Sequence, residues 1–287
     1  MNQVILSCGR LRATVLTPDS NNYRRSRFVR AGMISEVKLG EISFTQAERD
    51  QPGSKSTGGM GLCCEYKCPN MEETVAVGEQ WLKPGVGILR RENVPWSHLS
   101  EAEVEPLPNE WSADRDRISM TTWGGPLHGV AYRESRYILV EENEILLKVI
   151  LWNTGDVPLQ LLDYCHNFVS LGSQPLDDNQ HLLLPCVNNP SLIKPEDTLR
   201  PTVDGVTWER TPTRAFFRPF LPTHSEKTSW ILYQKDGALS ILEKDSFAPQ
   251  WLTLWGDRYC ICPEVYQRIS IRPGHWTKWT RRWRFEG

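Results

Sequence analysis

The sequence is dominated by short apolar segments that alternate with polar residues and are separated by turn residues. Apolar side chains recur at every second position or in short runs, and almost nowhere with the spacing of an amphipathic helix. Many short strands of this kind are typical of antiparallel sheets packed face to face. We therefore predict an all-β fold in which helix accounts for less than about a tenth of the residues, compared with the usual third.

The predicted strands are distributed over most of the chain. They cover residues 4–16 (two strands joined around Cys8-Gly9-Arg10), 33–39, 137–140, 145–152, 159–164, 229–234, 239–243, 251–255, 258–262, 266–271 and 278–285. Turns such as Asp236-Gly237 and Pro273-Gly274 divide them. Residues 51–61 are predicted to be an exposed loop, and the weakly patterned residues 185–222 a functional loop region. The sequence contains no repeat and no linker, so we predict one domain over residues 1–287.

Length, charge and composition restrict the classes of partner. A chain of 287 residues can bury a large core, and a net charge of −2 gives no reason to expect a nucleic-acid partner or an anionic membrane. The 12 tryptophans are an unusual number. Tryptophan combines a large apolar face with one N–H donor, so these side chains can fill a β-sheet core or stack on sugar rings. The composition leaves both roles open.

The eight cysteines are predicted to be free thiols. The N-terminal residues lack the basic and apolar regions of a signal peptide, and no apolar run approaches the roughly 18 residues of a membrane helix. We therefore expect a cytoplasmic protein in a reducing compartment, with no membrane partner. The spacings Cys63-Cys64-x3-Cys68 and Cys260-x-Cys262 differ from those of zinc sites, so we expect no metal.

Two segments carry a more specific signal. The segment Tyr164-Cys165-His166-Asn167-Phe168-Val169-Ser170-Leu171 and the later segment Cys262-Pro263-Glu264-Val265-Tyr266 resemble the histidine- and glutamate-bearing segments of galactose mutarotase-like (aldose 1-epimerase) proteins. Residues 25–35 and 81–90 resemble the uncharacterised aldose epimerase-like branch of this superfamily. These matches occur in the expected order over most of the chain. The resemblance implies one large antiparallel β-supersandwich.

The resemblance also implies acid–base chemistry at the anomeric carbon of a sugar. A base removes the proton of the C1 hydroxyl while an acid protonates the ring oxygen, so that the ring opens and recloses on its other face. Glu264 matches the base, and burial would have to raise its pKa from about 4.3. His166, as an imidazolium, matches the acid. Asp257 and Glu243 are alternative carboxylates, and no cofactor is required.

Six further residues are candidates for binding the sugar. They are His128, Arg90, Arg91, Arg27, Trp255 and Asp257. His128 belongs to a His-Gly pair like that of the mutarotases, but it lies only 38 residues before His166 (166 − 128). The arginines are candidates for anchoring ring hydroxyls, and strand alternation allows only one of Arg90 and Arg91 to face the site. Trp255 is a candidate for an aromatic wall of the pocket.

Two interpretations of function remain open at this point. The first is an aldose 1-epimerase-type mutarotase, and the second is a non-catalytic carbohydrate-binding protein on the same fold, because one fold hosts many functions. A lyase or hydrolase that uses the same two residues is a third, weaker alternative. The mutarotase interpretation predicts that His166 and Glu264 face each other across a cleft roughly 5–7 Å wide. In each case the partner is a small-molecule sugar or sugar derivative, and the protein is a monomer or a homodimer.

Overall fold

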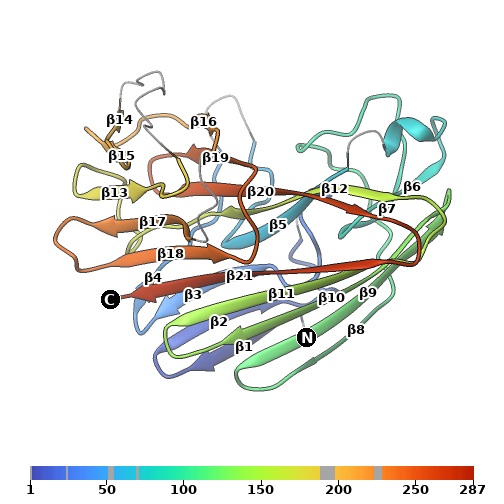
Figure 1. Cartoon of the computed structure of the whole chain (residues 1–287), viewed down its shortest axis with the longest axis horizontal. Helices are drawn as coiled ribbons and strands as arrows, with labels where there is room; N and C mark the ends of the chain where they lie inside the picture. The colour runs from blue at the N-terminus through green and yellow to red at the C-terminus, as the bar shows by residue number, and fades with distance from the viewer. Residues whose placement is uncertain (1, 24, 51–54, 69–70, 188–197, 223–227) are drawn as a thin grey trace.

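The computed structural model consists almost entirely of antiparallel strands (Figure 1). It describes residues 2–23, 25–50, 55–68, 71–187, 198–222 and 228–287. Within these ranges the one helical element is a short 3₁₀ turn, η1, at Glu72–Thr74. The predicted all-β fold is confirmed. No helix in the described part of the chain is long and apolar enough to span a bilayer.

Two large sheets make up the fold. The nine-stranded sheet contains, in spatial order, β1 (Gln3–Cys8), β2 (Leu11–Leu16), β3 (Ile34–Leu39), β5 (Leu62–Lys67), β12 (Leu159–Asn167), β20 (Ile261–Ile271), β19 (Trp251–Gly256) and β16 (Phe216–Phe220), with β4 (Ile42–Ser43) beside β3. The ten-stranded sheet contains β14 (Leu199–Pro201), β15 (Gly205–Trp208), β13 (Gln180–Leu183), β17 (Thr228–Gln234), β18 (Ser240–Asp245), β21 (Trp276–Glu286), β11 (Glu144–Asn153), β10 (Val130–Val140), β9 (Arg117–Leu127) and β8 (Asn109–Ala113). A separate hairpin joins β6 (Gln80–Lys83) to β7 (Gly87–Arg90).

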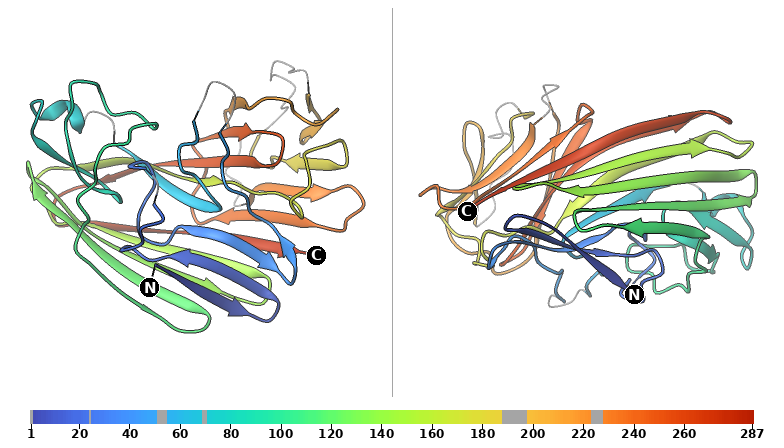
Figure 2. Two further views of the ribbon diagram at one scale, coloured as in Figure 1. Left: turned by 180° about the vertical axis from the view of Figure 1, so that it is seen from behind. Right: turned by 90° about the horizontal axis from the view of Figure 1, so that it is seen from below.

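The two large sheets pack face to face around a common core (Figure 2). In β11, for example, every second side chain is buried, and Ile145, Leu147, Val149 and Leu151 all point into the core. β1 and β2 lie against β10 of the other sheet. Five tryptophans are buried, so the core role accounts for many of these residues: Trp81, Trp208, Trp230, Trp279 and Trp283.

A buried ion network joins the two sheets. Arg281, on β21, donates to Asp163 on β12 at 2.7 Å and to Glu243 on β18 at 3.2 Å, and it lies 3.5 Å from Asp245. All four side chains are excluded from solvent. Removing one partner of such a network leaves uncompensated charge in a low-dielectric interior. The network therefore fixes how β12 sits against the ten-stranded sheet.

A predicted break between two strands is absent from the structure, in β20. Residues 258–262 and 266–271 were predicted as two strands, whereas residues 261–271 form one strand that runs through Pro263. Proline is tolerated there because the β12 ladder ends at the pair Tyr164–Tyr266, so no backbone N–H is needed on that side at Pro263. Instead, the Asn167 side chain donates to the Pro263 carbonyl at 2.6 Å.

The two predicted loop regions have different outcomes. In residues 185–222 the described part contains the short strands β14, β15 and β16, which gather with β13 at one end of the molecule (Figure 1). Residues 188–197 of this region lie outside the described residues, as do residues 51–54 of the first region. Residues 55–61 contain no strand, in agreement with a predicted loop, but the prediction that this loop is exposed is wrong. Residues 57–59 and 61 are buried, because the loop packs beside Arg27, which donates to Thr57.

Candidate active site

Four adjacent strands, β5, β12, β20 and β19, form the floor of a cleft. Side chains on one face of a sheet come from every second residue, and the register aligns those of neighbouring strands in rows. Tyr164 lies opposite both Glu65 and Tyr266, and Trp251 is the next partner of Tyr266. Two residues further along β12 and two residues back along β20, the same alternation brings His166 and Glu264 together on this face.

His166 and Glu264 lie in direct contact. The Nδ1 atom of His166 is 3.0 Å from Oε1 of Glu264, but without the alignment that a hydrogen bond requires. The predicted separation of 5–7 Å is therefore not present, and the gap is too small for a sugar C–O bond. Any shared substrate atom must approach both groups from the same side, from the cleft.

Glu264 has the properties of a general base. Burial raises its pKa to about 7, although hydrogen bonds from Tyr266 and Thr253 act in the opposite direction. These two hydroxyls donate to the same oxygen, Oε2, at 2.6 and 2.7 Å. The second oxygen, Oε1, is the one that lies beside His166. Glu264 therefore has one fixed oxygen and one oxygen directed at the histidine.

His166 is a neutral imidazole. Burial, reinforced by the positive charge of Arg27, holds its pKa well below the ordinary value. A guanidinium N–H of Arg27 lies 2.6 Å from Nε2 of His166, and a guanidinium can only donate. Nε2 is therefore the acceptor, and Nδ1 carries the proton. The expected imidazolium acid is corrected to a neutral ring with its N–H beside Glu264.

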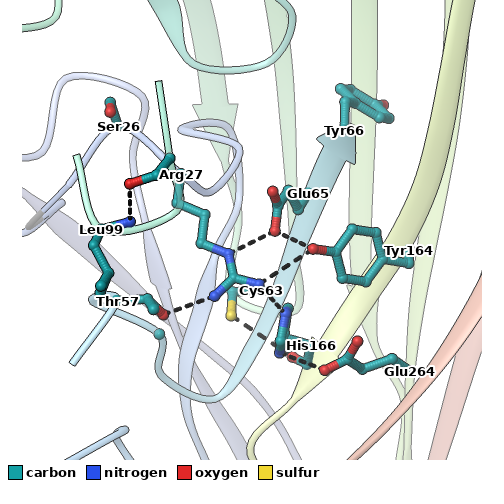
Figure 3. A network of polar contacts seen from close by, with 12 residues as sticks. Ser26, Arg27, Thr57, Cys63, Glu65, Tyr66, Leu99, Tyr164, His166 and Glu264 are labelled. Atoms are coloured by element: carbon teal, nitrogen blue, oxygen red, sulfur yellow. Dashed lines mark hydrogen bonds and ion pairs between the residues drawn. The ribbon is translucent and has the colours of Figure 1, made fainter. Parts of the chain in front are cut away.

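Arg27 is the centre of a polar network behind the histidine (Figure 3). Its guanidinium donates to Glu65 at 2.7 Å, to Thr57 at 3.0 Å and to Tyr164 at 3.3 Å, as well as to His166. Tyr164 in turn donates to Glu65. Burial alone would raise the pKa of Glu65, but Arg27 and further cationic groups hold it below the ordinary value, so Glu65 is a carboxylate that balances Arg27.

The cleft has a volume of about 320 Å³, within the range of small-ligand sites. Its lining combines charged, polar and aromatic side chains: Arg27, Glu48, Thr57, Lys67, His98, His166, Phe168, Phe217, Trp255, Glu264 and Tyr266. The ring of Phe168 stacks on His166 at 5.4 Å and meets Trp255 edge-on at 5.8 Å. Phe168 and Trp255 therefore form an aromatic wall of the cleft beside its polar groups.

Two of the six predicted sugar-binding residues line this cleft. Trp255 forms part of the aromatic wall, as expected from the sequence. Arg27 also lines the cleft, but its guanidinium donates to protein groups, and it orients His166. Asp257 is buried and accepts hydrogen bonds from the backbone N–H groups of Tyr259 and Cys260 at 2.7 and 3.0 Å. The contacts of Asp257 are those of a residue that stabilises a turn.

The other three predicted sugar-binding residues lie outside the cleft. His128 is exposed, adopts a positive φ of 52° and contacts the backbone carbonyl of Gln80 at 2.9 Å. Arg90 and Arg91 donate to the backbone carbonyls of Gly78 and Val75. The register of the β6–β7 hairpin explains this outcome, because both arginines extend toward the segment that precedes the hairpin. Glu243, the alternative base, belongs to the buried Arg281 network.

Sequence reasoning missed Lys67, His98, Glu48 and Glu65. Glu65 and Lys67 alternate on β5, so recognition of this strand would have predicted that they share a face. Its sequence, Leu-Cys-Cys-Glu-Tyr-Lys, gives little sign of a strand because a glutamate occupies a buried position. Glu48 and His98 come from loops, and nothing in their spacing indicates the site.

In the part of the chain that the structure describes, no group of three or more His, Cys, Asp or Glu side chains is arranged to hold a metal ion. No disulfide joins the eight cysteines, all of which lie within the described ranges.

The fold is that of the galactose mutarotase-like proteins. The structure superposes on a galactose mutarotase related enzyme from Lactobacillus acidophilus with a TM-score of 0.61 and 8% sequence identity, covering 99% of this chain and 97% of that one. A galactose mutarotase-like protein from Clostridium acetobutylicum gives 0.58 and 9%, with 99% and 95% covered. Galactose 1-epimerase from L. acidophilus NCFM gives 0.53 and 13%, with 99% and 98% covered.

These likenesses are structural. No protein-family model matches the sequence, and no curated protein matches it either. At identities of 8–13%, the solved structures establish the shared fold.

Proposed function

We propose that this protein is an aldose 1-epimerase-type mutarotase, which interconverts the anomers of a sugar. The observation that carries the proposal is a buried carboxyl group with a pKa of about 7, 3.0 Å from a histidine N–H nitrogen on the floor of a cleft. A base transfers protons best when its pKa lies near the working pH. The fold shared with a galactose 1-epimerase supports the same reaction class.

Glu264 carries out the proton transfers in this proposal. Its carboxylate removes the proton from the C1 hydroxyl, and the electron pair left on O1 forms the carbonyl as the bond between C1 and the ring oxygen breaks. The carboxyl group then delivers the same proton to the former ring oxygen. After rotation about the C1–C2 bond, the reverse steps close the ring on the other face. One carboxyl group can perform both transfers because the two sugar oxygens involved, O1 and the ring oxygen, are bonded to the same carbon, C1.

His166 stabilises the charge that develops on the ring oxygen. Its Nδ1–H is buried and has no aligned acceptor among the residues that the structure describes, so it is a donor held ready for a substrate atom. A neutral imidazole can polarise an oxygen by hydrogen bonding without giving up its proton. Arg27 maintains this tautomer by occupying Nε2. His166 thus acts as an electrophile, and Glu264 acts as both base and acid.

The proposal is tested by NMR measurement of anomer exchange across a panel of free sugars. Glu264→Gln retains shape and loses the base, so the rate should fall by about 10²- to 10⁴-fold with little change in sugar affinity. Activity of the wild type should rise with pH through about 7, as Glu264 ionises. Asp257→Ala, a change at a nearby buried acid outside the cleft, is the control. Full activity of Glu264→Gln would contradict the assigned base.

A second candidate is non-catalytic carbohydrate binding. The observation that favours it is the direct contact between His166 and Glu264, which leaves no room for substrate atoms between them. The aromatic wall and the polar groups of the cleft would then bind a sugar that is not converted. Calorimetric binding of a sugar whose anomers exchange at the uncatalysed rate would establish this alternative over the enzyme.

A further inference from the structure

A pair of cations lies beside the candidate active site, on the same sheet. Lys67, Leu162 and Arg268 are direct cross-strand neighbours on β5, β12 and β20. Leu162 is an even number of positions from His166 on β12, and Arg268 is an even number of positions from Glu264 on β20, so these residues lie on one face of the sheet. Lys67 is paired with Leu162 and lies on the same face. Two positively charged side chains thus flank one leucine at the edge of the cleft.

The side chain of Lys67 reaches back toward the catalytic groups. Its Nζ lies 5.0 Å from the ring centroid of Tyr164 and 5.4 Å from that of Tyr266, and Lys67 lines the cleft itself. Its positive charge acts to lower the pKa values of both Glu264 and His166. An ammonium in this position is within the electrostatic range of a molecule bound in the cleft.

Neither cation is neutralised by the protein. In the described ranges, no carboxylate forms an ion pair with Lys67 or Arg268, whereas the nearby Glu65 is paired with Arg27. The guanidinium of Arg268 lies 5.3 Å from the ring centroid of Trp251. Both cations are therefore supported by aromatic rings and retain their capacity to bind an anion.

Two further hollows border this pair, and the first of them shares Lys67 with the cleft. Lys67 and Leu162 line a cavity of about 330 Å³ together with Trp81 and Trp96. Leu162 and Arg268 line a second hollow, of about 510 Å³. Because Lys67 belongs to both the cleft and the first cavity, a substituent on a sugar in the cleft can extend past it without leaving the protein surface.

We infer that Lys67 and Arg268 form a subsite for an anionic group on the substrate, so that the preferred substrates are sugars bearing a phosphate or a carboxylate away from the anomeric carbon. This inference rests on the proposed function for its reaction and on the two unpaired cations for its specificity. Lysine and arginine bind such oxyanions through charge-assisted hydrogen bonds, and two of them favour an anion over a neutral hydroxyl group.

The test compares each of two anionic sugars, a hexose phosphate and a hexuronate, with the corresponding neutral hexose. Wild-type kcat/KM for anomer exchange should be at least about tenfold higher for an anionic sugar, and the preference should shrink as ionic strength rises. Lys67→Met and Arg268→Gln should each reduce the ratio of anionic to neutral kcat/KM by about tenfold. The kcat/KM values for the hexose phosphate and the hexuronate show whether the subsite prefers phosphate or carboxylate.

The other sheet provides matched controls. Arg133 lies 5.3 Å over the Trp152 ring and Lys148 lies 5.8 Å over the Tyr137 ring, so Arg133→Gln and Lys148→Met remove the same charges from similar surroundings. Both controls should leave the ratio unchanged. Equal kcat/KM for anionic and neutral sugars in the wild type would overturn the inference, as would a preference that survives in both Lys67→Met and Arg268→Gln.

Calorimetry separates this inference from the proposed function. If no sugar is interconverted, the proposed function fails, but the anionic sugars should still bind more tightly than the neutral hexose, and Lys67→Met and Arg268→Gln should remove that difference. Equal binding of anionic and neutral sugars would refute the anion subsite whether or not the protein is an enzyme.

Discussion

Replacing Glu264 by glutamine is expected to stabilise the protein at alkaline pH while it removes the base. Burial raises the pKa of Glu264 to about 7, compared with an ordinary value of 4.5, a difference of about 2.5 pH units (7 − 4.5). The folded protein therefore holds this proton more tightly than the unfolded chain does. The favourable contribution is complete below pH 4.5 and is lost as the pH rises through about 7. At 1.36 kcal/mol per unit, the loss is about 3 kcal/mol.

Urea unfolding of the wild type and of Glu264→Gln at pH 5 and pH 8.5 measures this effect. Glutamine does not titrate, and the other ionisable groups are common to both proteins, so the difference between the two free energies of unfolding isolates Glu264. The variant should gain about 3 kcal/mol relative to the wild type between these two pH values. A difference that is independent of pH would show that Glu264 has an ordinary pKa, and the assignment of the base would lose its physical support.

Three further substitutions test other parts of the structure. Arg281→Met leaves three buried carboxylates without their cation and should lower the free energy of unfolding by about 3–5 kcal/mol in urea titrations; a neutral effect would show that the network is dispensable. Trp255→Ala removes part of the aromatic wall and should raise KM more than it lowers kcat in the anomer-exchange assay, and an unchanged KM would place the sugar elsewhere. Asp257→Ala removes the acceptor for two backbone N–H groups and should cost about 1–2 kcal/mol of stability without affecting KM, whereas a large rise in KM would restore Asp257 as a sugar ligand.

Alternation in the sequence predicted strands best where the core-facing positions are apolar. β11 illustrates this case, since four of its five buried residues are aliphatic and its bounds differ little from the predicted ones. β10 illustrates the opposite case, because only residues 137–140 were predicted, whereas the strand begins at Val130. Two of its buried residues, Glu134 and Arg136, are charged and form an ion pair at 2.8 Å. Buried charges that neutralise each other within one strand cannot be distinguished from surface charges in a sequence.

The candidate site was predictable only in part for a related reason. His166 and Glu264 were found through segments that resemble a known superfamily, and the structure brings the two side chains together. The ionisation state of His166 depends on burial and on Arg27, which is 139 residues away in the chain. Such a contact arises from strand register and from a loop conformation. Residue spacing contains neither kind of information.

The side chain of Asn167, the residue that follows His166, forms hydrogen bonds with residues of both sheets. Its side chain donates to Pro263 on β20 and to Glu243 on β18, and it accepts from the indole N–H of Trp283 on β21 at 3.0 Å. The end of β12 that carries His166 is therefore held by contacts that form when the two sheets dock. Contacts between such distant segments form slowly, because the loop-closure entropy must be overcome before they contribute stability. A folding intermediate with native strands in one sheet alone would show β-structure in circular dichroism and would have no functional cleft.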